Sequence, residues 1–137
     1  MTELAITRIF DAPRELVYRA FTDPDQLARW FGPAGWSVPR DTVDMDVRPG
    51  GHQRFVMVND ADPSLTSPVD AVFAEVVENE LLVGDEPGSG MRIRLEFHDT
   101  GDGRTRLELR QGPYPPEFTG GAREGWGTSF DKLDALL

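Results

Sequence analysis

Hydrophobic residues near the C-terminus repeat with the period of an α-helix. Trp126, Phe130, Leu133 and Leu137 follow one another at spacings of four, three and four residues, which places them on one face of a helix. We therefore predict a helix over residues 118–137. Its apolar face either closes a hydrophobic core or, as the alternative, also forms one wall of a pocket.

A glycine stands on each side of the tryptophan in this predicted helix. Gly125 and Gly127 each weaken a helix by about 1 kcal/mol relative to alanine. Glycine is understandable at these positions if a sheet or a ligand approaches the backbone closely. The pair therefore favours a helix that packs tightly beside Trp126.

The N-terminal part of the chain predicts one strand and two short helices. Residues 3–10 alternate between apolar and polar side chains, which is typical of a strand. The first helix, residues 13–21, is expected to use Asp11 as its N-cap and to bury Leu16, Val17, Ala20 and Phe21. Asp23, Pro24 and Gln26 then form a second start of the capping-box type, and the second helix ends at Gly32-Pro33.

From Trp36 onward the hydrophobic period changes to two, which predicts strands. We expect six of them, at residues 43–48, 52–58, 69–77, 81–86, 91–98 and 104–110. Short turns join neighbouring strands, so the sheet should be antiparallel and the fold class α+β. No linker divides the chain, and we expect one domain over residues 1–137.

Charge patterning suggests a register for the last two strands. If His98 pairs with Arg104, Glu96 faces Arg106 and Arg94 faces Glu108. A slip by two residues creates like-charge pairs, each unfavourable by roughly 0.2–1 kcal/mol. We therefore predict this register, with the leucines between the charged residues facing inward.

Composition and charge limit the partners and cofactors that we expect for this protein. The net charge of −10 argues against nucleic acids and anionic membrane surfaces as partners. The chain has no cysteine, and strand parity places His52 and His98 on the outer face of the sheet. We expect no metal site and no cofactor. The chain shows no signal peptide and no apolar run of the ~20 residues that a membrane helix needs, so we expect a cytoplasmic protein.

The segments FDAPRELVYRAFTDPDQLARWFGP, RPGG and REGWGTSFDKLDALL together resemble the START-like (Bet v 1-like, SRPBCC) superfamily. More narrowly, they are similar to its single-domain bacterial branch related to the activator of Hsp90 ATPase, from about Ile6 to Leu137. This resemblance implies a helix-grip fold, in which a seven-stranded antiparallel sheet curls around the C-terminal helix and two short helices follow the first strand. It also implies a hydrophobic cavity between the sheet and that helix.

A cavity of this kind is expected to hold a small hydrophobic or aromatic molecule. A dry void of about 300 Å³ would cost about 7 kcal/mol, so side chains, water or a ligand should fill it. Candidate ligand-binding residues are the large aromatic and methionine side chains, namely Trp30, Trp36, Phe55, Met57, Met91, Phe97, Trp126 and Phe130. Tyr18 and Tyr114 are candidates for the cavity mouth.

Two alternatives to a binding protein stay open. Members of the superfamily include cyclases, aromatases and dehydratases, so one alternative that the resemblance implies is an enzyme of that kind, although the sequence shows no catalytic constellation. A protein-interaction module related to Hsp90 co-chaperones is the other alternative. The eukaryotic Hsp90 activator engages the chaperone through an additional N-terminal domain. Because this chain begins at its first predicted strand, we do not expect it to act as an Hsp90 partner.

Overall fold

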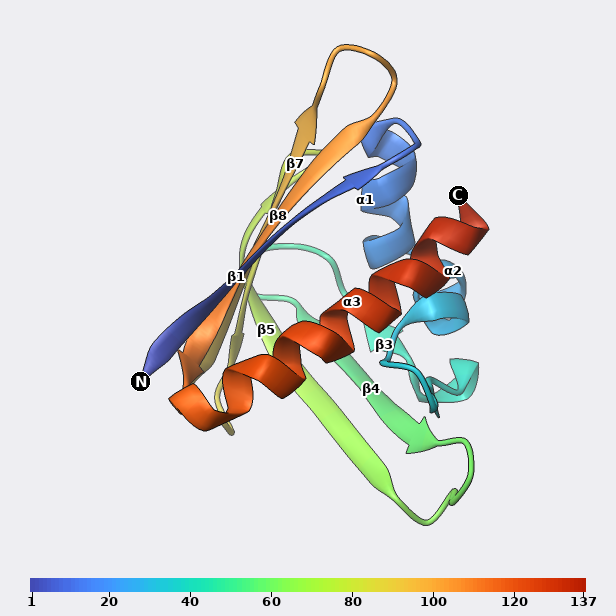
Figure 1. Ribbon diagram of the computed structural model, residues 1–137, viewed down its shortest axis with the longest axis vertical. Coiled ribbons are helices and arrows are strands. Elements are labelled where there is room, and N and C mark those ends of the chain that lie inside the picture. Colours follow the sequence, from blue (N-terminus) through green and yellow to red (C-terminus); the bar gives the residue numbers. More distant parts are fainter.

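A curled antiparallel sheet forms the frame of the protein in the computed structural model, which describes residues 1–137 (Figure 1). Its strands are β1 (Thr2–Phe10), β2 (Trp36–Ser37), β3 (Asp44–Met45), β4 (His52–Asn59), β5 (Thr66–Val77), β6 (Leu81–Glu86), β7 (Met91–Asp99) and β8 (Thr105–Tyr114). Seven strands lie in the order β1-β8-β7-β6-β5-β4-β2, and the two-residue β3 pairs with β4 as an eighth.

Three α-helices cover the concave side of this sheet. They are α1 (Arg14–Thr22), α2 (Pro24–Trp30) and α3 (Thr119–Leu136), with short 3-10 turns at Arg40–Thr42 and Pro116–Phe118. Figure 1 shows α3 crossing in front of the sheet, with α1 and α2 beside the C-terminal half of α3. The predicted α+β helix-grip fold is therefore confirmed. No helix is both long and apolar enough to span a membrane.

The apolar stripe of α3 lies where its spacing predicts. Phe130 and Leu133 are fully buried, whereas Leu137 lies beyond the helix end and is 38% exposed. Arg8 of β1 ties the outer side of α3 to the sheet through ion pairs with Asp131 at 2.7 Å and Asp134 at 2.5 Å. The helix is thus held to β1 by charge on one side and by apolar packing on the other.

No neighbouring atom lies so close to the two glycines beside Trp126 that a side chain there would clash. A Cβ at Gly127 would meet nothing within 4 Å, and one at Gly125 would lie 3.6 Å from the Cβ of Pro33, an ordinary contact. The expectation that these glycines mark tight packing was therefore wrong, although Gly125 does lie beside the segment that follows α2.

The helix starts show one confirmed and one wrong prediction. The Asp23 side chain accepts hydrogen bonds from the backbone N–H groups of Asp25 and Gln26, as expected of an N-cap. Asp11 caps nothing: α1 begins after Pro13 without a side-chain cap, and Asp11 instead lies 3.5 Å from Arg104 across the end of the sheet. Leu16 is also 44% exposed, because α1 turns that side toward solvent.

The strand predicted over residues 43–48 is reduced to the two residues of β3. Met45 still pairs with Gln53 of β4. After one more bond across the strands, from the backbone N–H of Asp46 to the carbonyl oxygen of His52, the chain turns: the backbone N–H of Arg48 donates to the carbonyl oxygen of Asp46 and that of Gly51 to the carbonyl oxygen of Arg48. These local bonds replace the ladder that a longer strand would make.

The register predicted for β7 and β8 was wrong by two residues. Glu96 lies opposite Glu108, Arg94 opposite Arg110 and His98 opposite Arg106. The inward direction of the apolar row was correct, since Leu95 is 6% and Leu107 is 1% exposed. Apolar packing and the turn set the register, and the charged side chains adapt by pairing along their own strands rather than straight across.

Candidate functional site

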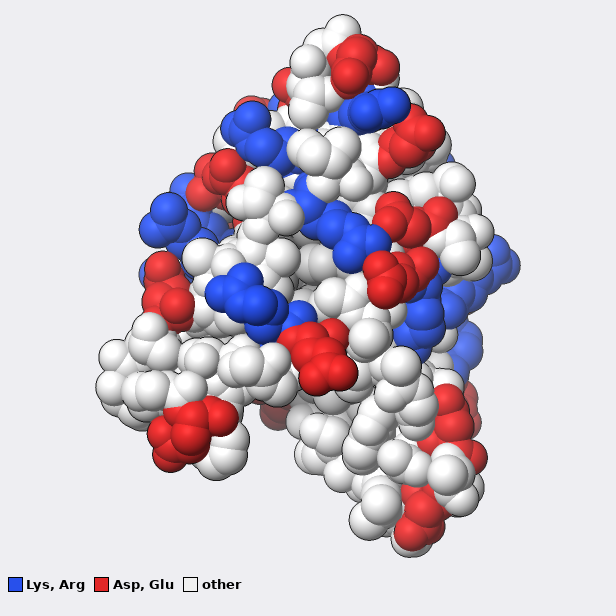
Figure 2. All heavy atoms as spheres, in the orientation of Figure 1, with Lys and Arg blue, Asp and Glu red and all other residues white.

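A cavity of about 310 Å³ lies between α3 and the concave face of the sheet. Thirteen of its 23 lining residues are hydrophobic. The lining residues come from strands β4 to β8, from α3, from the segment after α2 and, through Phe21, from the end of α1. Figure 2 shows a notch in the surface between the start of α3 and the β4–β5 hairpin, and residues of both elements line the cavity.

The predicted ligand-binding residues divide into two groups. Phe55, Met57 and Trp126 line the cavity. The other five lie outside its wall: Trp30, Phe97 and Phe130 are buried in the core, Trp36 lies in edge strand β2, and Met91 begins β7. The core group packs behind the cavity, because the ends of α1 and α2 cover that part of the concave face.

Trp126 connects the cavity to this core through aromatic contacts. Its ring lies 5.5 Å from that of Phe130 and 5.6 Å from that of Phe31, in an edge-to-face arrangement with the latter. Phe31 in turn meets Phe55 at 4.8 Å. Such contacts add about 0.5–1.5 kcal/mol each beyond the area they bury, so this wall of the cavity is firmly positioned.

Gln111 forms a polar feature in the otherwise apolar wall. Its side-chain oxygen Oε1 accepts hydrogen bonds from Trp126 Nε1 and from the Tyr114 hydroxyl, both at 2.8 Å. Indole N–H only donates, so these bonds fix the amide orientation and leave the amide NH₂ group without a protein partner. Gln111 is only 8% exposed and lines the cavity.

Glu86 is the one carboxylic acid in the cavity wall. It makes neither an ion pair nor a side-chain hydrogen bond, and burial raises the pKa of its carboxyl group. Burial also raises the pKa of the Tyr114 hydroxyl, and the nearby charge of Glu86 raises it further. The cavity therefore contains an unpaired acid and a phenol in addition to its apolar wall.

Sequence reasoning found only part of this polar set. Tyr114 was expected near the cavity mouth and lines the cavity, whereas Tyr18 is buried against Phe97, with ring centres 5.4 Å apart. Gln111 was missed because the predicted strand ended at residue 110. Continued alternation from Leu107 and Leu109 would have placed it on the inner face.

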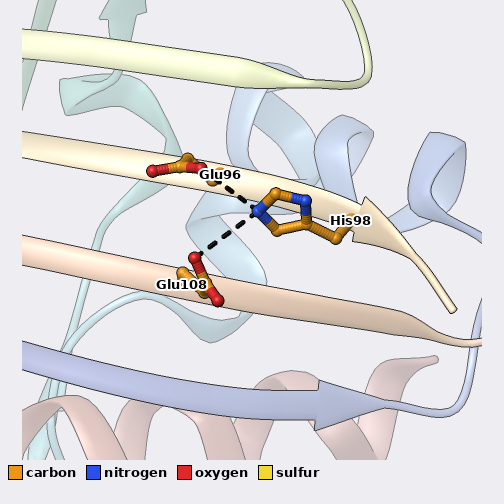
Figure 3. A group of neighbouring side chains, drawn as sticks. All are labelled: Glu96, His98 and Glu108. Carbon is orange, nitrogen blue, oxygen red and sulfur yellow. Dashed lines mark hydrogen bonds and ion pairs between the residues drawn. The ribbon is translucent and has the colours of Figure 1, made fainter.

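The outer face of the sheet carries a second group of titratable side chains, Glu96, His98 and Glu108 (Figure 3). His98 Nε2 lies 3.1 Å from Glu96 Oε1 and 3.5 Å from Glu108 Oε2. The imidazole thus bridges two carboxylates that face each other across β7 and β8. The ligand atoms of these three side chains all lie within 4.8 Å of one another, close enough to bind one cation.

Both carboxylates of this outer group already have arginine partners. Arg94 lies 3.0 Å from Glu96 and Arg106 lies 3.2 Å from Glu108. Hydrogen bonding to Arg94 is the main cause that lowers the pKa of Glu96. The group is therefore explained as a network that compensates the like-charge register. Both histidines are partly exposed on the outer face, as predicted, and His52 lies 3.0 Å from Asp44.

Comparisons with known proteins agree with this architecture. A solved structure of protein NE0264 from Nitrosomonas europaea has a TM-score of 0.85 and 28% identity, covering 98% of this chain and 93% of that one. Protein CV1439 from Chromobacterium violaceum has a TM-score of 0.85 and 26% identity, covering 98% and 95%. An AHSA1-like protein from Aeromonas hydrophila, at 18% identity, covers 98% and 94% with a TM-score of 0.84 and shares the fold.

No protein among the curated sequences matches this chain. A family model does match, that of the Activator of Hsp90 ATPase homolog 1-like proteins, over residues 11–137. The matched range includes α1, α2, every cavity-lining residue and the whole of α3. The chain therefore belongs to the family of Activator of Hsp90 ATPase homolog 1-like proteins.

Proposed function

We propose that this protein binds a small hydrophobic or aromatic molecule in the cavity between the sheet and α3. The observation that carries the proposal is the cavity itself, about 310 Å³ in volume and mostly apolar in its lining. This volume is at the lower end of the ~300–1,000 Å³ that ligand pockets occupy. It fits a compact ring system or a short chain better than a lipid.

Energetics favour an apolar ligand over water in this cavity. The cavity opens at the surface, so water enters it when no ligand is bound. Water is held well only where polar groups can bond to it. Such groups are few in this wall, so an apolar ligand gains more from the space than water does.

A pair of variants on one strand tests the proposal. Ala71 of β5 lines the cavity, whereas Ala74 of the same strand is exposed. We expect a panel of small aromatic compounds to raise the melting temperature of the wild type and of Ala74→Phe. Ala71→Phe fills the cavity and should respond much less, and urea unfolding checks that it is folded. The proposal is refuted if no compound stabilises the wild type or if both variants respond alike.

A second candidate function is an enzyme acting on such a molecule. The observation in its favour is Glu86, whose carboxyl pKa is raised by burial in the cavity wall close to the Tyr114 hydroxyl. Acids with perturbed pKa values in cavities are candidates for proton transfer. Incubating the stabilising compounds with wild-type protein and with Glu86→Gln, followed by mass spectrometry, distinguishes turnover from binding.

A further inference from the structure

We propose that the ligand of this cavity is a hydrophobic amine, bound in its protonated form by Glu86 with its apolar body against the aromatic wall. This inference rests on the proposed binding function and names the class of ligand. Its basis is the polar end of the cavity, formed by Glu86, Gln111 and Tyr114. These residues lie at the ends of β6 and β8, on the side of the sheet where α3 begins (Figure 1).

Glu86 points into the cavity because of its position in β6. It has the same parity as Leu82 and Gly84, which also line the cavity. Asp85 has the opposite parity and pairs with Arg92 at 2.7 Å on the outer face. Two adjacent acids on one strand thus differ: the outer one has an arginine partner, and the inner one has none.

A carboxylate in an apolar wall favours a cation over other head groups. Glu86 is partly buried, and a charged group that loses part of its contact with water is favoured by a partner of opposite charge. A ligand ammonium can donate a charge-assisted hydrogen bond to Glu86, while a ligand carboxylate would be repelled. No lysine or arginine lines the cavity, so the cation has to come from the ligand.

Gln111 and Tyr114 complete the polar end with fixed directions. The Tyr114 hydroxyl donates to Gln111 Oε1 and therefore keeps its own lone pairs available to accept from an ammonium. The Gln111 amide NH₂ group, held in a side chain that is 8% exposed, is left to donate to a neutral polar atom of the ligand or to a water beside it. The polar end of the cavity thus offers one acceptor, the Tyr114 hydroxyl oxygen, and one donor, the Gln111 amide, to polar atoms of a ligand.

Three probes with one phenylbutyl body test the inference: 4-phenylbutylamine, its neutral isostere 4-phenylbutanol, and 4-phenylbutanoate. We expect isothermal titration to show the amine binding at least about tenfold more tightly than the alcohol, which corresponds to about 1.4 kcal/mol. The carboxylate should bind most weakly. Glu86→Gln should lower the amine affinity about tenfold or more and change the alcohol affinity less than about threefold.

Glu124→Gln is the matched control, because Glu124 is exposed on α3 outside the cavity and its replacement removes the same charge. It should leave all three affinities unchanged. The inference is overturned if the alcohol binds as tightly as the amine, if Glu86→Gln keeps the amine preference, or if Glu124→Gln weakens the amine equally. In these cases the binding function survives. If no probe binds the wild type although compounds of the aromatic panel stabilise it, the inference fails and the binding function survives; if the panel fails as well, both fail.

Discussion

Replacing Trp126 by alanine should separate the structural role of this side chain from its role in the cavity wall. The indole ring packs against Phe31 and Phe130 and donates a 2.8 Å hydrogen bond to Gln111. The ring is only partly buried, so the loss should fall near the lower end of the ~3–5 kcal/mol typical of buried Trp→Ala changes. We expect about 3 kcal/mol, or a decrease in melting temperature of roughly 10 °C.

Trp126→Phe separates the hydrogen bond from the packing. Phenylalanine keeps an aromatic ring against Phe31 and Phe130 but cannot donate to Gln111. Gln111 Oε1 would still accept a hydrogen bond from the Tyr114 hydroxyl. The expected loss is therefore that of one hydrogen bond, about 1 kcal/mol. Urea unfolding of the wild type and the two variants measures both contributions.

Urea unfolding of Trp126→Ala in the presence of free indole tests the role of this side chain in the cavity wall. Trp126→Ala joins the volume of the missing side chain to the existing cavity, so indole should bind there. At about one hundred times its dissociation constant it would restore about 2.7 kcal/mol of stability. Two results would contradict this reasoning: a loss below about 1 kcal/mol in Trp126→Ala, or no restoration by indole up to its solubility limit.

Two further pairs of variants test individual statements about the fold. Asp23→Ala should destabilise by about 1 kcal/mol because it removes the N-cap of α2, while Asp11→Ala should change the unfolding midpoint far less because Asp11 caps no helix. Glu86→Gln should stabilise the unliganded protein at neutral pH. The pKa of Glu86 is raised in the folded state, so its contribution to stability is present below about pH 4.5 and is lost as the pH rises through the folded-state pKa. Glutamine carries no charge and avoids this loss. Glu96→Gln should do the opposite, since a lowered pKa contributes stability above about pH 4.5 that disappears on acidification. Urea midpoints at neutral pH and below about pH 4.5 check both signs.

Residues with a strong local signal made most of the fold predictable. The spacing from Trp126 to Leu133 located α3, and the order of Asp23, Pro24 and Gln26 located the start of α2. Alternation assigned the inner face of β4 and of β7 correctly at Phe55 and Leu95. In each case the signal comes from the residues of one element, so no knowledge of distant packing is needed.

Predictions that depended on competing partners failed. The register of β7 and β8 was inferred from charge pairs worth a few tenths of a kcal/mol, and the structure places Glu96 opposite Glu108 instead. Arg94 and Arg106 satisfy these carboxylates along the strands, which the sequence allows equally well. The sequence also could not show which aromatic residues line the cavity. Phe97 is covered by Tyr18 of α1, a contact between elements that are distant in the sequence.

The difference between Glu86 and Glu96 shows how one sheet separates two kinds of surface. Both glutamates lie on long strands of the curled sheet, one on β6 and the other on β7. Glu96 faces outward, where Arg94 and His98 lower the pKa of its carboxyl group. Glu86 faces inward, where burial raises the pKa and no protein cation is available. Glu96 thus takes part in the charge network of the outer face, whereas Glu86 is the acid that the proposed ligand would meet.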